Sequence, residues 1–212
     1  MSDSLFILGP DYSTFTRSVR IYCEMMSIKY ESGMTVRGET LTFKSKALTQ
    51  YNPFGKVPVL LHGNIVIFET TSICRYLEKV FVKQSLKPLT ANEAALVDSW
   101  AQAIYINVDK AVIRDYVLEF TFPKGDNGKI REDVIAKNFD IARQNLAIVS
   151  KQSDNKTFLC GTQFSIADAI LLPVLDYAAQ TPNKEKLFAS FDNLLAYLEY
   201  LKSLAPIKKL LS

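Results

Sequence analysis

The sequence predicts an α/β domain with a mixed sheet, followed by an all-helical domain. Its 212 residues are enough for one or two domains with a sizeable core. Two short apolar runs, 57–61 and 65–68, flank the turn residues His62–Gly63–Asn64, which is typical of a β-hairpin. Strand patterns alternate with helical ones up to about residue 80, whereas beyond residue 91 only long amphipathic helical patterns remain.

The first domain is predicted to contain seven elements in the order β-α-β-α-β-β-α. A short strand at Leu5–Leu8 ends at Gly9–Pro10, and a helix follows to about Met26. A βαβ unit combined with an antiparallel hairpin favours a mixed sheet with helices on its faces. The other elements are a strand at 29–36, a short helical segment at 43–51, the hairpin, and a helix at 69–80.

The hairpin and the helix after it form the most informative stretch. Pro58 stands at the start of the first hairpin strand, and because proline cannot donate to a sheet, it marks a strand start or a special bend. After the second strand, Thr70 or Thr71 can cap the helix. Glu69 therefore stands at a helix N-terminus, where free N–H groups and the positive dipole end suit a bound carboxylate.

The predicted domain boundaries are 1–82 for the α/β domain, 83–91 for a linker, and 92–212 for the helical domain. The first helix of the second domain begins near Ala94 and reaches Val108 or Tyr116. Further helices are expected at 130–150, from Ser165 onward, and at 192–203. Ser165 and Asp168 have the spacing of a capping box, so we interpret Asp168 as part of a helix cap and not as a catalytic acid.

Composition and charge argue against several classes of protein. The net charge of +3 is too small to indicate a nucleic-acid or membrane partner. No stretch approaches the ~20 apolar residues of a membrane span, and the first residues lack the basic segment of a secretory signal. The three cysteines form neither a disulfide framework nor a redox or metal motif, so we expect a cytoplasmic protein without a metal.

The stretch Asn52-Pro-Phe-Gly-Lys-Val-Pro-Val-Leu60, followed by Phe68-Glu-Thr70 at the strand–helix junction, resembles the glutathione transferases. The similarity covers most of the chain and is strongest to the plant phi-like and related bacterial members. It implies a thioredoxin-like first domain that binds glutathione and an all-α helical bundle as the second. Glutathione would be the co-substrate, and its thiolate would attack a hydrophobic electrophile.

The loop before the first helix supplies the candidate catalytic group. A free thiol has a pKa near ~8.5 and only the thiolate attacks, so such an enzyme must stabilise the anion. From the residues alone, Ser13 is equally well a simple helix N-cap. The phi-like pattern G-x-x-x-S-T-x-T-R-x-V is matched by Gly9, Ser13, Thr14, Thr16, Arg17 and Val19. The resemblance assigns catalysis to Ser13, with Tyr12 as the weaker alternative because other classes place their tyrosine inside the first strand.

The resemblance also implies how glutathione is held. Pro58 would be cis, and the backbone of Val57 before it would pair with the cysteinyl part of glutathione, as an added strand does. Glu69 and Thr70 match the acid–hydroxyl pair that holds the γ-glutamyl amine and carboxylate.

Two lysines complete the implied glutathione site. Lys44 matches a lysine that meets the glycyl carboxylate. Lys56 departs from the family, which has a glutamine before the valine. It either adds a charge contact to a carboxylate or points into solvent.

The second substrate and the assembly are implied in less detail. The helical domain would wall the electrophile site, with Tyr105, Val112, Tyr116 and Leu118 as candidate lining residues, although core packing explains each of them equally simply. Phe54 lies in a loop from which several transferase classes insert an aromatic side chain into the partner subunit, so we expect a two-fold homodimer with Phe54 at its interface.

Other activities of the same fold stay open at this point. The thiolate could also reduce organic hydroperoxides, and glutathione-coupled isomerisation or dehalogenation is a third reaction type. The alternative from another class is a non-catalytic protein that binds glutathione or hydrophobic ligands, or serves as an interaction module. The matching loop around Ser13, together with Glu69–Thr70, favours the enzyme.

Overall fold

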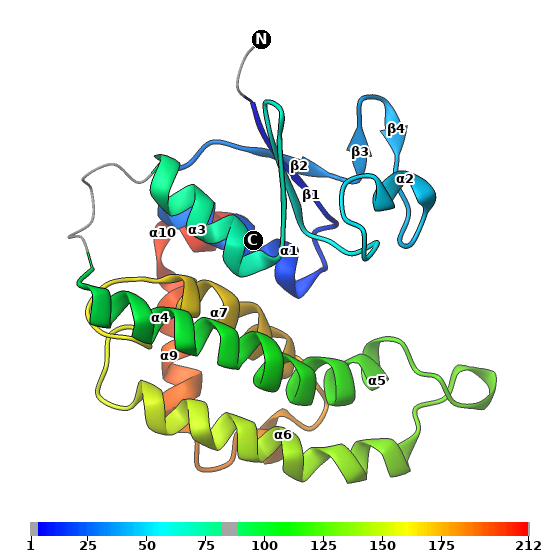
Figure 1. Ribbon diagram of the computed structural model, residues 1–212. Coiled ribbons are helices and arrows are strands. Elements are labelled where there is room, and N and C mark those ends of the chain that lie inside the picture. The colour runs from blue at the N-terminus through cyan, green and yellow to red at the C-terminus, as the bar shows by residue number, and fades with distance from the viewer. Residues whose placement is uncertain (1–3, 82–88, 212) are drawn as a thin grey trace. The chain divides into compact units, whose positions relative to one another are not determined.

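The computed structural model describes residues 4–81 and 89–211 (Figure 1). The chain forms two compact units, one from the described residues of Met1–Leu89 and Ala205–Ser212, the other from Thr90–Leu204. The expected linker, 83–91, lies largely outside the described residues. Within the described ranges no helix is both long and apolar enough to cross a membrane.

A four-stranded mixed sheet forms the centre of the first unit, in the order β2-β1-β5-β6 (Figure 1). β1 runs parallel to β2 and antiparallel to β5, and β5 runs antiparallel to β6. This is the mixed sheet that the sequence predicts. The strands are β1 (Leu5–Leu8), β2 (Glu31–Gly33), β5 (Val59–His62) and β6 (Ile65–Phe68).

Two helices of twelve residues each, α1 (Thr14–Met25) and α3 (Thr70–Phe81), pack against the sheet and against each other. The short α2 (Lys46–Thr49) is capped by Ser45, whose hydroxyl accepts a hydrogen bond from Leu48 N at 3.1 Å. Below α2, a core cluster of Leu8, Val36, Leu41, Leu48 and Val59 joins this loop region to the sheet. Removing these apolar side chains from water stabilises the end of the sheet from which α1 departs.

The strand expected at 29–36 is divided in the structure. Its first part is β2, whereas β3 (Thr35–Val36) pairs with β4 (Glu39–Thr40) in a separate two-stranded sheet. Arg37 and Gly38 between them have φ values of 52° and 83°. Two consecutive positive φ angles are the mark of a two-residue hairpin turn, which reverses the chain where the sequence suggested a continuous strand.

The second unit is helical, as predicted. α4 (Ala91–Ala103), the π-helical segment η1 (Ile104–Val117) and α5 (Leu118–Thr121) follow one another without a break, so this helix extends beyond both expected ends. The remaining elements are a 3-10 turn η2 (Asp126–Gly128), α6 (Glu132–Ser153), α7 (Ile166–Ala178), α8 (Lys184–Leu187) and α9 (Asp192–Ser203). Thr90, expected in the linker, caps α4 in a capping box with Glu93.

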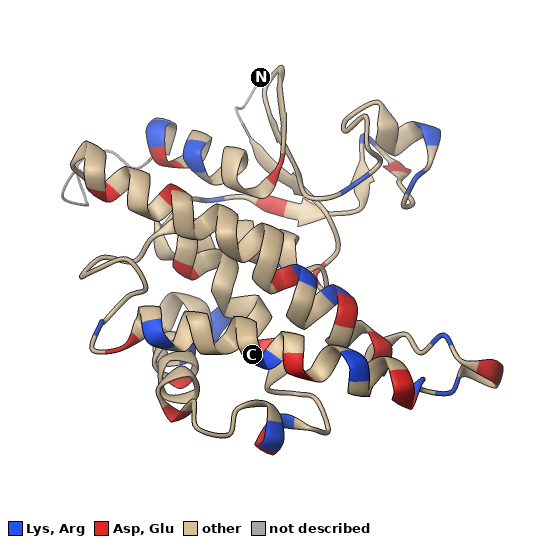
Figure 2. Ribbon diagram, turned by 60° about the horizontal axis from the view of Figure 1, so that its bottom comes forward, with Lys and Arg blue, Asp and Glu red and all other residues tan. Residues whose placement is uncertain are grey.

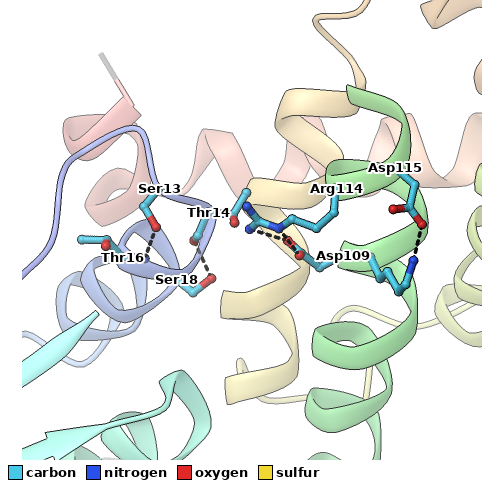
Figure 3. A network of polar contacts seen from close by, with 8 residues as sticks. Ser13, Thr14, Thr16, Ser18, Asp109, Arg114 and Asp115 are labelled. Atoms are coloured by element: carbon cyan, nitrogen blue, oxygen red, sulfur yellow. Dashed lines mark hydrogen bonds and ion pairs between the residues drawn. The ribbon is translucent and has the colours of Figure 1, made fainter. Parts of the chain in front are cut away.

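Within η1, two ion pairs join residues five apart. Arg114 Nε lies 2.7 Å from Asp109 Oδ2, and Lys110 Nζ lies 2.5 Å from Asp115 Oδ2 (Figure 3). At 3.6 residues per turn, residues five apart point in different directions, whereas a wider turn brings them onto one face. Both pairs therefore suit the π-helical register.

The C-terminal segment differs from expectation. α10 (Ala205–Leu211) follows α9, belongs to the first unit and packs against α1, with Ile207 fully buried. The second unit thus ends at Leu204, whereas the helical domain was expected to continue to residue 212. Along the helices, Lys and Arg positions are interspersed with Asp and Glu positions (Figure 2).

Candidate functional site

The register of the sheet gathers three predicted site segments at one edge. Leu8, the last residue of β1, lies opposite Val59, and Val59 lies opposite Phe68, the last residue of β6. The β1–α1 loop, the Val57–Pro58 bend and the β6–α3 junction therefore all leave the sheet at the same end. Because α1 and α3 both begin there, two helix N-termini with free N–H groups meet at this edge.

Ser13 occupies the N-cap of α1. Its hydroxyl oxygen accepts a hydrogen bond from Thr16 N at 3.4 Å (Figure 3). Its carbonyl accepts one from Arg17 N at 2.9 Å. Ser18 Oγ donates to Thr14 O at 2.9 Å in the same turn. Since the Ser13 oxygen already accepts from the helix, its proton can be donated outward. The N-cap role and the thiolate-donor role are thus compatible in one residue.

The turn that presents Ser13 depends on Gly9. Gly9 N donates to Gly33 O at 2.9 Å, which ties the end of β1 to β2. A Cβ atom on Gly9 would lie 2.2 Å from Thr16 Oγ1, so a larger residue fits only if the Thr16 side chain or α1 shifts. Thr16 is fully buried, and its hydroxyl has no hydrogen-bond partner among the described residues. Tyr12, the alternative to Ser13, is 61% exposed.

The Val57–Pro58 peptide bond is cis, as the resemblance implies. Val57 is partly buried and Pro58 is buried directly before β5. Sequence reasoning missed the residue that organises this bend, which is Asn52. Its side chain is 2% exposed and bonds to the backbone at Phe54 and Lys56. The available signal was an asparagine that begins a turn rich in Pro and Gly.

Lys44 and Lys56 are both exposed and stand on neighbouring loops. A Cβ atom on Gly55, the residue before Lys56, would lie 3.1 Å from Lys44 Cα. The structure therefore brings the backbones of the two lysine-bearing loops into contact. A lysine ammonium group is a donor suited to a carboxylate, so both residues stay candidates for that role.

Glu69 and Thr70 form the junction between β6 and α3. Glu69 is partly buried with a φ of 70°, a left-handed conformation that costs energy for a residue with a side chain and is frequent at ligand sites. Its carbonyl accepts from Ile73 N at 2.9 Å. Because α3 begins at Thr70, Thr70 and Thr71 lie in the first helical turn instead of capping it.

The Thr70 hydroxyl at this junction is a buried polar group without a partner among the described residues, as is the Thr16 hydroxyl. Thr70 is 1% exposed. A buried polar atom without a partner costs free energy and calls for an explanation, which a bound polar group would supply. Together, this edge offers an acidic acceptor, hydroxyl groups, two helix N-termini and two lysines to a ligand that carries an amine and carboxylates.

The residues expected around the electrophile lie in or beside η1. Tyr105 and Leu118 are partly buried, whereas Val112 and Tyr116 are fully buried. The ring of Tyr116 packs against Phe120 and Phe139 at centroid distances of 5.3 and 6.0 Å. Val112 and Tyr116 therefore contribute to a core, and their role toward a second substrate stays a prediction.

Asp168 is a structural acid. It is fully buried and accepts hydrogen bonds from Leu159 N at 2.7 Å, from Ser165 N at 2.7 Å and from Ser165 Oγ at 2.6 Å. Tyr197 Oη also donates to it. The capping box is present, and these interactions hold the loop before α7 and tie α7 to α9.

The cysteine thiols are poorly suited to act as nucleophiles. Burial raises the pKa of Cys160 to about 12, and it raises the pKa values of Cys23 and Cys74 well above the ordinary value of a thiol. Only the thiolate reacts readily, so none of the three is poised for attack near neutral pH.

Comparison with known proteins identifies the family. The family models described as "Glutathione S-transferase, N-terminal domain" and "Glutathione S-transferase, C-terminal domain" match residues 12–80 and 113–212. The chain is 30% identical to a probable glutathione S-transferase from Solanum tuberosum, over 77% of this chain and 68% of the relative.

Solved structures agree with the sequence comparison. Poplar glutathione transferase F1 superposes with a TM-score of 0.83 at 25% identity, over 98% of this chain and 96% of the other. A theta class glutathione S-transferase from Xanthomonas axonopodis pv. citri, solved with glutathione bound, gives a TM-score of 0.83 at 22% identity, over 98% and 96%. The first unit has the thioredoxin-like fold of this family. The chain is a member of the glutathione S-transferase family.

Proposed function

We propose that this transferase conjugates glutathione to hydrophobic electrophiles, with Ser13 donating a hydrogen bond that stabilises the thiolate. The observation that carries the proposal is the position of Ser13 at the N-terminus of α1, at the sheet edge where Val57 and Glu69 also lie. A hydroxyl donor and the helix dipole both favour a sulfur anion over a neutral thiol.

The other residues of this edge bind the tripeptide. The Glu69 carboxylate accepts from the γ-glutamyl ammonium, and the unpartnered hydroxyl of Thr70 donates to the neighbouring carboxylate. The backbone of Val57 pairs with the cysteinyl residue, as an added strand would. Lys44 and Lys56 meet the carboxylate at the glycyl end. This division of roles matches the positive and negative groups of glutathione one by one.

The reaction itself is a nucleophilic displacement or addition. The thiol proton leaves to solvent, and a sulfur lone pair forms a bond to the electrophilic carbon. In a displacement, the leaving group departs with its bonding electrons. In an addition, the electron pair of the double bond under attack moves to the neighbouring atom, which takes up a proton. The same thiolate attacks the O–O bond of an organic hydroperoxide. There a second glutathione completes the reaction, giving glutathione disulfide, the alcohol and water.

Turnover across a small panel tests the proposal. Chloronitrobenzene and isothiocyanate substrates report conjugation, cumene hydroperoxide reports reduction, and maleylacetoacetate reports isomerisation. We expect conjugation, with Ser13→Ala, measured near neutral pH, as the matched low-activity control. Tight glutathione binding without turnover of any substrate in the panel would contradict the proposed transferase activity. It would favour a protein that binds glutathione without catalysis. Cytoplasmic location and homodimeric assembly stay predictions from the sequence.

A further inference from the structure

The turn from Asn52 to Lys56 is held by one buried side chain. Asn52 Nδ2 donates to Lys56 O at 2.9 Å, and Asn52 Oδ1 accepts from Phe54 N at 3.0 Å. The backbone carbonyl of Asn52 also accepts from Gly55 N at 2.8 Å. With Asn52 only 2% exposed, both ends of its amide are used inside the turn. The turn is therefore fixed by a buried polar network and not by its proline alone.

The bond to Lys56 O sets the direction of the next amide. The bond between Lys56 and Val57 is trans, because Val57–Pro58 is the cis bond of the described chain. A planar trans peptide holds its C=O and N–H in opposite directions. With the Lys56 oxygen directed at Asn52, the N–H of Val57 is directed away from Asn52. Asn52 thereby orients the backbone group that we assign to the cysteinyl residue.

The same turn also sets the position of Lys44. Gly55 has a φ of 61°, and a Cβ atom there would lie 3.1 Å from Lys44 Cα and 3.6 Å from Lys44 N. Lys44 itself has a φ of 61°. The turn and the Lys44 loop therefore meet backbone to backbone. If the turn loses the hydrogen bonds of the Asn52 side chain, we expect the spacing between Lys44 and Val57 to change.

The γ-glutamyl side of the site is built differently. Glu69 and Thr70 are placed by β6 and α3, and β6 pairs along its length with β5. The Asn52 turn meets this segment through side chains: the ring centroids of Phe54 and Phe68 lie 6.3 Å apart, and Val57 and Phe68 pack against the same core cluster. The turn should consequently affect one end of the ligand more than the other.

We propose that Asn52 is a positioning residue for the cysteinyl–glycyl end of glutathione, which it aligns through Val57 and Lys44 without touching the ligand. The proposal rests on the proposed function, because it assumes that Val57 and Lys44 hold that end. Under this proposal, Asn52 contributes to the difference in affinity between thiol ligands with and without the glycyl residue.

Calorimetric binding of two ligands tests this role. Glutathione carries the glycyl carboxylate, whereas γ-glutamylcysteine lacks the glycine. We expect Asn52→Ala to lower the affinity for glutathione about ten-fold and the affinity for γ-glutamylcysteine by less. The ratio of the two affinities should therefore fall. Asn64→Ala, an exposed asparagine in the β5–β6 turn, is the matched control and should leave both affinities unchanged.

A double-mutant comparison separates positioning from general damage. Lys44→Ala should lower the glutathione affinity less in the Asn52→Ala background than in the wild type. Glu69→Gln should lower the glutathione affinity by the same factor in both backgrounds. Circular dichroism and Tm check the fold, and Asn52→Ser replaces Asn52→Ala if the latter does not fold. Equal losses for both ligands, or a full Lys44→Ala effect in both backgrounds, would overturn the proposal. Wild-type protein that fails to bind glutathione would instead reject the proposed function.

Discussion

Thr16 N donates a hydrogen bond to the hydroxyl oxygen of Ser13 across 3.4 Å at the start of α1. Because the oxygen serves the helix, the Ser13 proton is available to a bound sulfur atom. The N-cap role of Ser13 is thus observed and is compatible with the donor role, which stays a prediction. The first prediction concerns that proton.

Ser13→Ala should raise the pKa of the thiol of bound glutathione, because a donor to the anion is lost. Turnover near neutral pH should fall about 10²-fold, as on removal of a donor to a developing anion, and recover partly at high pH. Thiolate absorbance of the glutathione complex against pH measures the shift. Tyr12→Phe is the control. If it moves the titration and Ser13→Ala does not, this is a tyrosine-type enzyme.

Glu69→Gln should weaken glutathione binding by ~1.5–3 kcal/mol, about ten-fold or more, because the ligand ammonium loses its charged acceptor. Calorimetry of the folded variant measures the change. Glu39→Gln replaces an exposed acid of the same unit and should have no effect. Equal affinities for wild type and Glu69→Gln would show that Glu69 is only a residue of the β6–α3 junction.

Phe54 is 66% exposed, and we predict a two-fold homodimer in which its ring is buried by the partner. Phe54→Ser should then weaken the dimer by about 2 kcal/mol or more, which a dilution series followed by light scattering detects. Phe122→Ser, at a ring that is 57% exposed in the other unit, is the matched control. A wild-type monomer at micromolar concentration would disprove the interface.

Gly9→Ala should destabilise the protein by ~1–3 kcal/mol, because its Cβ would lie 2.2 Å from Thr16 Oγ1. The double variant Gly9→Ala/Thr16→Ala should recover part of this loss by removing the clash. Thr16→Val should be neutral or stabilising, since it replaces a buried hydroxyl without a partner by a methyl group. The Tm values of the three variants, compared with that of the wild type, measure these changes in stability. A Gly9→Ala loss that Thr16→Ala leaves untouched would place the strain elsewhere.

Glu119 predicts a dependence of stability on pH. Its buried carboxylate accepts hydrogen bonds from Arg131 N, Nε and Nη2, and these lower its pKa from 4.5 to about 2. A carboxylate with a lowered folded-state pKa stabilises the protein above its unfolded pKa, and the contribution is lost as the pH falls through the folded value. The Tm difference between wild type and Glu119→Gln should therefore be constant near neutrality and narrow between pH 4.5 and about 2.

Asp140→Asn, which replaces an exposed acid in the middle of α6, is the control for this pH series and should show no such narrowing. A Tm difference between wild type and Glu119→Gln that persists unchanged down to pH 2 would show that the charge of the carboxylate does not contribute to its interaction with Arg131.

Local patterns predicted the elements that assemble the site. The hairpin and the α1 and α3 helices follow from apolar periodicity, turn residues and caps, all of which act within a few residues. The long helix continues past Tyr116 to Thr121 because nothing in the sequence stops it before Phe122. The Thr35–Thr40 hairpin was missed because its turn, Arg37–Gly38, lacks the usual asparagine before glycine.

Features that depend on distant residues could not be predicted in the same way. Asn52 was named only as part of a motif, since its burial follows from the folding of the turn around it. Gly9 is required because Thr16, seven positions later, returns to within contact of it. The alignment of Leu8, Val59 and Phe68 depends on sheet register, which arises from pairings that no single segment encodes.

The return of α10 to α1 has a consequence for how the protein is made. In chain order, Thr90–Leu204 is an insertion within the first unit, whose last helix is synthesised after the whole of the second. Until α10 is synthesised, α1 therefore lacks the helix that packs against it and that carries the buried Ile207. In a chain that ends at residue 204, Ser13 would lie on α1 without α10 packed against this helix. The N-terminus of α1 should therefore reach its final packing only at the end of synthesis.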